Sequence, residues 1–239
     1  MVHILCYNIY APPMITRKEH VSKICNHIKD ILVKQPQVTV IALTEVFRTW
    51  VREQLLHELA SIEGKWKATP IVHKGTINVS SGLLVMWNTN HVVRDGNMHS
   101  VEYKRCFQLD CFSNKGAVHV PLKIKQSSVP FNLILTHMQA WQPECSSVRG
   151  SQFKQLGSLL KNIPKENVVI VGDFNENPNQ NFCSEHNLKM PTDTFLETYE
   201  KHFFDHVYSN QNVQIEKLNY HDNPSDHSPV LVKLNVGKE

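Results

Sequence analysis

The chain has 239 residues, of which 41% are hydrophobic, and a chain of this size and composition can bury one sizeable core. We therefore expect a single domain over residues 1–239. Its 25 basic and 22 acidic residues leave a formal net charge of +3, without blocks of like charge, which argues against a nucleic-acid-binding protein and against a polybasic membrane anchor.

Short apolar runs rich in β-branched residues predict strands along the whole chain. Several of these runs are nearly continuous rather than alternating, which is typical of strands that are buried on both faces. The predicted strands cover residues 2–7, 38–43, 81–87, 116–124, 131–137, 167–173 and 229–234.

Helices are predicted between some of these strands. The first has a capping box, Thr16 with Glu19, and apolar residues at helical spacing up to Leu32. The others run from about Trp50 to Leu59 and from about Val148 to Leu160. Residues 72–135 show strands without a helix, which favours antiparallel hairpins there. The pattern indicates an α/β protein in which helices cover the sheets.

Polar and ionisable side chains follow several of the predicted strands. Each could be an ordinary turn former or surface group when taken alone. Together they are typical of an α/β scaffold that builds a site at its strand ends. The residues are Asn8, Glu45, His137, Asp173, Asn175, Asp226 and His227.

These residue types suit the hydrolysis of a phosphodiester. Glu45 and Asn8 offer the hard oxygen ligands that Mg²⁺ prefers, whereas the histidines lack the spacing of a zinc site. Asp226 could hold the tautomer of His227, which would then take a proton from water. His137 could donate to the leaving oxygen, so that in-line attack by water needs no protein nucleophile.

The motifs "YNIY", "LTEVF", "THMQA", "GDFNENP" and "SDHSPV" in this order resemble the endonuclease/exonuclease/phosphatase superfamily. This resemblance implies a deoxyribonuclease-like fold, a four-layered α/β sandwich with two central mixed sheets. The segment "THMQAWQPECSSVRGSQFKQL" looks most like the neutral sphingomyelinases. The resemblance implies that Glu45 and Asn8 are metal ligands and that Asp173 and Asn175 orient the attacking water and the phosphate. It also implies that His137 and His227 act on the phosphate and its leaving group, and that Asp226 orients His227.

The resemblance implies a Mg²⁺-dependent phosphodiesterase of phospholipase C type, with Mn²⁺ or Co²⁺ as substitutes, that cleaves sphingomyelin to ceramide and phosphocholine. The expected partner is a phospholipid at a membrane surface, and we expect a monomer. One alternative is a nuclease of the same fold, which the mild basicity and few interleaved aromatic residues disfavour. Another is a binding protein that has lost catalysis, which is disfavoured because every required side chain is present.

An enzyme that works at a lipid surface needs exposed apolar side chains near its site. Trp141, in a polar loop after His137, is the preferred candidate, and Gln139 and Lys115 join it as predicted substrate-binding residues. Phe47 and Trp50 are the second choice, with inward packing as the alternative for Phe47.

The six cysteines show no metal-ligand spacing. Relatives often have a disulfide partner at the position of Cys145, which would make Cys106 or Cys111 its other end. The first residues do not read as a signal peptide, and no run approaches the roughly 20 apolar residues of a spanning helix. We therefore expect a soluble protein with six reduced cysteines, in the cytoplasm rather than as a secreted mature form.

Overall fold

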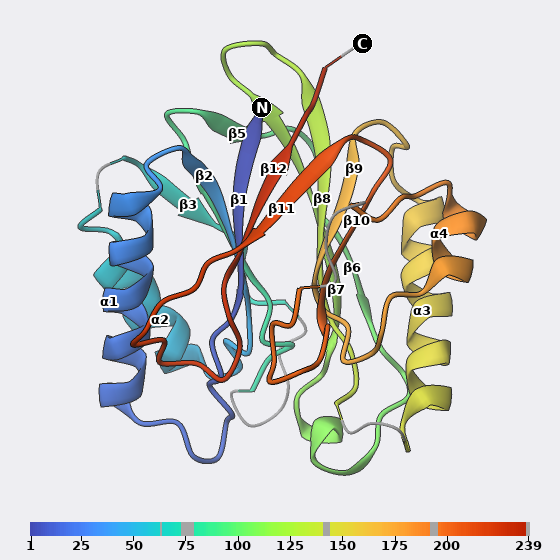
Figure 1. The fold of residues 1–239 in the computed structure, drawn as a ribbon, viewed down its shortest axis with the longest axis horizontal. Helices are drawn as coiled ribbons and strands as arrows, with labels where there is room; N and C mark the ends of the chain where they lie inside the picture. The colour runs from blue at the N-terminus through green and yellow to red at the C-terminus, as the bar shows by residue number, and fades with distance from the viewer. Residues whose placement is uncertain (63, 73–78, 141–143, 192–195, 238–239) are drawn as a thin grey trace.

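The computed structural model describes all of the 239 residues except 63, 73–78, 141–143, 192–195 and 238–239. Two mixed six-stranded sheets pack face to face, and helices cover the outer face of each sheet (Figure 1). The layers follow the order helix, sheet, sheet, helix. The predicted four-layered α/β sandwich is therefore confirmed.

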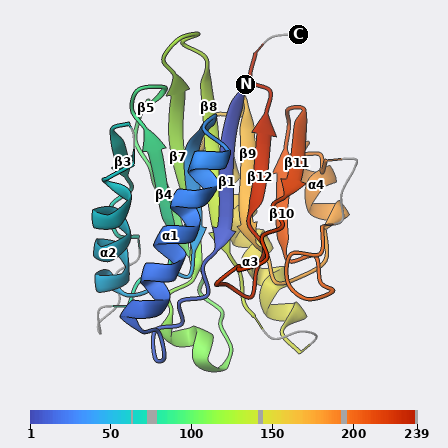
Figure 2. The ribbon, with the colours of Figure 1, turned by 60° about the vertical axis from the view of Figure 1, so that its left-hand side comes forward.

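The first sheet has β1 (Val2–Asn8) and β2 (Val38–Thr44) at its centre, and these two strands are parallel and joined by helix α1 (Lys18–Lys34). The other pairs of neighbouring strands in this sheet are antiparallel. Helix α2 (Thr49–Leu59) lies beside α1 on the same face (Figure 2). In spatial order the strands are β11 (Val213–Lys217), β12 (Val230–Leu234), β1 (Val2–Asn8), β2 (Val38–Thr44), β4 (Leu84–Asn88) and β3 (Trp66–Ala68).

The second sheet has β8 (Pro130–His137) and β9 (Val168–Asp173) as its parallel pair, joined by helix α3 (Ser146–Lys161). Helix α4 (Gln180–His186) follows β9 and packs against α3, and the short 3-10 helix η1 (Gln108–Phe112) precedes β7. In spatial order the strands are β10 (Asp205–Ser209), β9 (Val168–Asp173), β8 (Pro130–His137), β7 (Gly116–Ile124) and β5 (Val92–Arg94), while β6 (His99–Glu102) also pairs with β7.

The nearly continuous apolar runs are explained by burial on both faces of each sheet. In β1, Ile4 and Cys6 point into the core between the sheets, whereas Leu5 and Tyr7 pack under α1 and α2. Successive side chains of a strand point to opposite faces, so a strand in the middle of four layers needs apolar residues at almost every position.

The predicted strands and helices are all present, with three differences. The first helix begins at Lys18 with Arg17 as its N-cap, and the hydroxyl of Thr16 donates instead to the carbonyl of Pro12, so the predicted capping box is wrong. Residues 72–135 contain η1 as well as strands. The short elements β3, β5, β6, β10, β11 and α4 were not predicted.

The cysteines differ from both expectations. Cys106 and Cys111 form a disulfide with each other, while Cys145 is buried and free. The prediction of six reduced cysteines is therefore wrong, and so is the alternative that pairs Cys145. The bridge closes a short loop around η1 rather than joining distant elements.

Among the described residues, no helix combines the length and the apolar character that crossing a membrane requires.

Candidate active site

The two parallel strand pairs end on the same side of the sandwich, and the predicted site residues meet there. Asn8 is the last residue of β1 and Asp173 is the last residue of β9, in different sheets. The Asn8 amide donates to the Asp173 carboxylate at 2.9 Å. Side chains 165 residues apart in the sequence therefore form one site.

Asn8 lies at the centre of this site. Its Nδ2 atom is 3.3 Å from Glu45 Oε1 and 3.5 Å from His227 Nε2, in addition to its bond with Asp173. Its Oδ1 atom accepts a hydrogen bond from the backbone N–H of Tyr10 at 3.0 Å. Asn8 thus presents its amide nitrogen to the carboxylates, and its predicted role as an oxygen ligand of a metal stays a prediction.

His227 is oriented by a residue that sequence reasoning missed. Its Nδ1 atom lies 2.7 Å from Asp205 Oδ2, and both side chains are buried. Asp226 is exposed, and its carboxylate accepts from the hydroxyl of Ser225 at 3.4 Å. The prediction that Asp226 orients His227 is therefore wrong. Asp205 begins β10 directly opposite Asp173 of β9, a pairing that the sequence does not reveal.

His137, the last residue of β8, lies beside Asp173 in the site. Its Nε2 atom is 3.6 Å from Asp173 Oδ2, and its ring packs against Phe47 with centroids 6.0 Å apart. Its buried Nδ1 atom has no hydrogen-bond partner within the described part of the chain. Phe47 is itself buried, and Trp50 is partly buried against the core beneath α1 and α2. Inward packing of Phe47 is thus confirmed, and it is not an exposed lipid contact.

The backbone around the site is held in unusual conformations. Gly172 has φ +141°, and a Cβ atom there would lie 1.9 Å from the carbonyl oxygen of Thr136 on β8. Glu45 and Asn175 have φ values of +66° and +50°, which L residues adopt at an energetic cost and often at functional sites. Asn175 is held by its backbone N–H, which donates to Asp173 Oδ1 at 2.9 Å.

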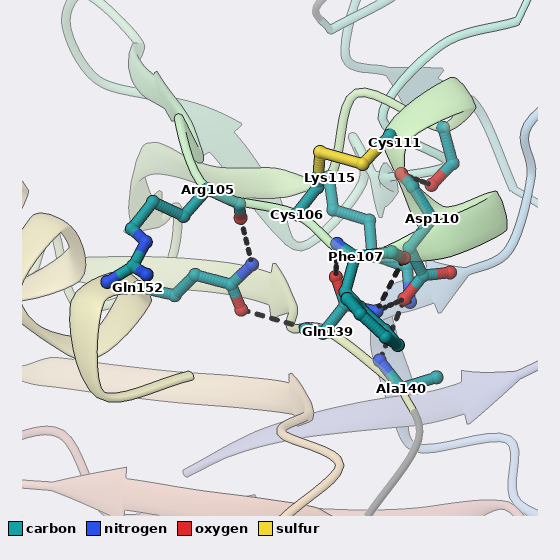
Figure 3. The surroundings of a disulfide bond; sticks show 10 residues. Arg105, Cys106, Phe107, Asp110, Cys111, Lys115, Gln139, Ala140 and Gln152 are labelled. Atoms are coloured by element: carbon teal, nitrogen blue, oxygen red, sulfur yellow. Dashed lines mark hydrogen bonds and ion pairs between the residues drawn. A yellow bond between two sulfur atoms is a disulfide. The ribbon is translucent and has the colours of Figure 1, made fainter. Parts of the chain in front are cut away.

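Two predicted substrate-binding residues belong to the framework beside the site. Gln139 is fully buried, and its amide pairs with the backbone of Phe107 and donates to Asp110 at 2.8 Å. Gln139 therefore does not line an open substrate surface. Lys115 is also buried, and its Nζ atom donates to Asp110 at 2.8 Å (Figure 3). The same atom donates to the carbonyl of Met138 at 2.9 Å. Trp141 lies outside the described residues.

Burial and crowding shift the pKa values of the site. Burial raises the pKa of Glu45 to about 7 and that of Asp173 to about 6. Burial lowers the pKa of His137 well below its usual range, and the positive charge of Lys115 adds to this. Burial also acts to lower the pKa of His227, but the Asp205 carboxylate and its hydrogen bond outweigh it and raise the value to about 10.

The donor set fits a divalent cation. Ligand atoms of Asp173, Asp205 and His227, all buried, lie within 4.8 Å of one another. Asp205 Oδ1 is buried without a hydrogen-bond partner among the described residues, and Glu45 adds a further carboxylate through its contact with Asn8. Crowded carboxylates whose charge is disfavoured by burial are stabilised by a cation, and oxygen donors suit a hard one.

The fold and the position of these residues define a deoxyribonuclease-like α/β sandwich with a cluster of acidic and histidine side chains at one end. Solved structures with this fold resemble the chain over nearly its whole length. Sphingomyelinase C from Streptomyces griseocarneus is 18% identical, with a TM-score of 0.71 over 98% of this chain and 99% of that chain. A beta toxin variant from Staphylococcus aureus with bound magnesium ions is 16% identical, with a TM-score of 0.75 over 97% and 98%.

TDP2 from D. rerio, in complex with a single-strand DNA product, is 12% identical, with a TM-score of 0.68 over 98% of both chains. The sequence matches no protein-family model. It also matches no curated protein. Similarity at this level of identity establishes the fold.

Proposed function

We propose that the protein is a divalent-metal-dependent phosphodiesterase in which water attacks the phosphorus atom. The observation that carries this proposal is the convergence of Glu45, Asp173 and His227 on the amide of Asn8, with Asp205 behind the imidazole. Carboxylates for a cation, a group to take a proton and a protonated imidazole to donate one are thereby gathered where four strands end.

Mg²⁺ is the proposed ion, held by Glu45 with Oδ1 of Asp205 as a further oxygen donor. When bound, it would stabilise negative charge on the phosphate and lower the pKa of a water molecule. The beta toxin structure with magnesium ions supports the choice of this metal. A role for Mn²⁺ or Co²⁺ as substitutes stays a prediction.

We assign the proton transfers from the charge states of the site. Asp205 holds His227 in its protonated form, so His227 is suited to donate from Nε2 to the phosphate or to the leaving oxygen rather than to act as the base. Asp173 has a pKa of about 6 and accepts the proton of the attacking water near neutral pH. Asn8 and Asn175 would position the phosphate of the substrate, and the neutral side chain of His137 would line the rest of the phosphate site.

The substrate that we propose is sphingomyelin, cleaved to ceramide and phosphocholine. The support comes from the "THMQA" to "RGSQ" segment, which resembles the neutral sphingomyelinases, and from the structural similarity to sphingomyelinase C. Single-domain organisation, a monomeric state and a cytoplasmic location stay predictions.

A nuclease is the second candidate, and the similarity to TDP2 with its DNA product favours it. The test compares release of phosphocholine from choline-labelled sphingomyelin micelles with nicking of plasmid DNA, each with Mg²⁺ and with EDTA. Metal-dependent release of phosphocholine without nicking supports the proposal, and nicking alone assigns the nuclease. Absence of both activities, together with hydrolysis of no soluble phosphodiester, would instead indicate a binding protein.

A further inference from the structure

The loop closed by the disulfide carries a group of large apolar side chains that point into solvent. Phe107 is 41% exposed, Leu109 67% and Phe112 62%, and all three lie within or next to the bridge between Cys106 and Cys111. Single exposed apolar residues are normal on soluble proteins, but several together on one loop mark an interaction surface.

The local geometry separates an apolar face from a polar face. A 3-10 helix has three residues per turn, so Leu109 and Phe112 in η1 lie one above the other. Asp110, between them in sequence, turns toward the protein and accepts hydrogen bonds at 2.8 Å from Lys115 Nζ, Gln139 Nε2 and the backbone N–H of Ala140 (Figure 3). The loop is therefore fixed to the protein through its polar side while its apolar side faces outward.

A second apolar projection lies at the same end of the molecule. Met14 and Ile15 are exposed in the segment between β1 and α1, which leads away from Asn8. This segment belongs to the half of the molecule with the first sheet, and η1 belongs to the half with the second sheet. Both lie at the lower end of the sandwich in the two views (Figures 1 and 2). The strands that carry the site also end there, so both projections lie at the same end of the molecule as the candidate site.

Basic residues adjoin both projections. Lys104 and Arg105 directly precede the disulfide loop, and Arg17 and Lys18 follow Ile15 after Thr16, all four of them exposed. The ion pairs of the described residues include none of these four side chains. Apolar side chains bordered by basic ones are the arrangement that binds at the boundary between anionic headgroups and acyl chains.

We propose that the disulfide loop and the segment of Met14 and Ile15 form a membrane-docking surface, and that its partner is a phospholipid bilayer containing anionic lipid. The proposal rests on the proposed function, because it brings the candidate site to a lipid substrate. It assigns the lipid contact to residues other than Phe47, which is buried.

The test is flotation of the full chain with vesicles of phosphatidylcholine and phosphatidylserine in EDTA, which measures binding without turnover. We expect the Leu109→Glu/Phe112→Glu variant to bind at least about tenfold more weakly, because two apolar side chains no longer enter the bilayer. Leu109→Ser/Phe112→Ser should show the same direction without new charge. Val33→Glu is the matched control, since Val33 is 81% exposed in the last turn of α1, at the other end of that helix.

Equal binding by wild type and both double variants, or no binding by wild type, would overturn the docking surface. A melting temperature below that of wild type would show that a variant has lost stability. The comparison of vesicle binding is then made with the other double variant. The vesicles contain no sphingomyelin, so this outcome is separate from the proposed function: a wild type that floats but hydrolyses no sphingomyelin would retain the surface and lose the proposed substrate.

Discussion

Replacing Asp205 with Asn tests the central arrangement of the candidate site. The substitution keeps the shape of the side chain but removes the charge that lies 2.7 Å from His227 Nδ1. With Asp205 present, the pKa of His227 is raised from 6.5 to about 10. Without that carboxylate, burial acts more strongly against the imidazolium, so we expect the pKa of His227 to fall, although Asp173 and Asp226 still raise it.

The expected loss of activity is large. General acid or base groups typically contribute factors of about 10²–10⁴, and an imidazole that loses its orienting carboxylate loses much of this. We expect kcat/KM for a soluble phosphodiester to fall about 10²-fold or more in Asp205→Asn. Asp226→Asn is the matched control, because Asp226 is exposed and contacts Ser225 rather than Nδ1 of His227. A smaller loss in Asp205→Asn than in Asp226→Asn would refute the reasoning.

The same substitution has a defined effect on stability. A histidine whose pKa is raised in the folded state stabilises the fold fully below its ordinary value of 6.5, and this contribution disappears as the pH rises through about 10. A hydrogen bond to a charged group is worth about 1.5–3 kcal/mol, and relief of repulsion between Asp205 and Asp173 offsets part of that loss. Urea unfolding in EDTA should therefore show Asp205→Asn less stable near pH 6.5 and close to wild type near pH 10.

The remaining predictions address the metal, the backbone and the cysteines. Glu45→Gln should need much more Mg²⁺ for half-maximal activity, because a neutral amide replaces a carboxylate; full activity at low Mg²⁺ would place the metal elsewhere. Gly172→Ala should lower the free energy of unfolding by about 3 kcal/mol or more, because its Cβ meets a carbonyl oxygen on β8. Gly150→Ala in α3 is the control, because nothing lies within 4 Å of a Cβ there, and it should be stabilising by about 0.5–1 kcal/mol. Equal changes in the free energy of unfolding by urea for the two variants would contradict the close contact at Gly172. Thiol titration of the denatured chain without reductant should detect four thiols, and six would contradict the disulfide.

The sequence predicts well those elements whose burial is continuous. The central strands β1, β2, β8 and β9 are apolar on both faces, and the ends of these strands locate Asn8, Glu45, His137 and Asp173. Strand β11 has only five residues, none of them fully buried, and α4 has only seven, so neither forms an apolar pattern long enough to be recognised in the sequence.

The role of Asp205 shows what a linear reading cannot supply. Asp226 is next to His227 in the sequence, but it lies in a bend and is exposed, whereas His227 is buried. Asp205 lies 22 residues away and reaches the imidazole because β10 pairs with β9 in a register that sets Asp205 opposite Asp173. Register is decided by tertiary packing, so the orienting carboxylate follows from the pairing of two strands.

The apolar loop was missed for a related reason. Six cysteines allow 15 complete pairings, and composition does not choose the one bridge, which joins cysteines five positions apart at η1. Phe107 and Leu109 are two residues apart and Leu109 and Phe112 are three apart, so the three residues together keep no single period of a strand or of a helix. In a 3-10 turn, the three-residue spacing places Leu109 and Phe112 on one side, and Asp110 fixes the other side to the protein. The exposed surface is thus a property of the closed loop and not of its residues taken singly.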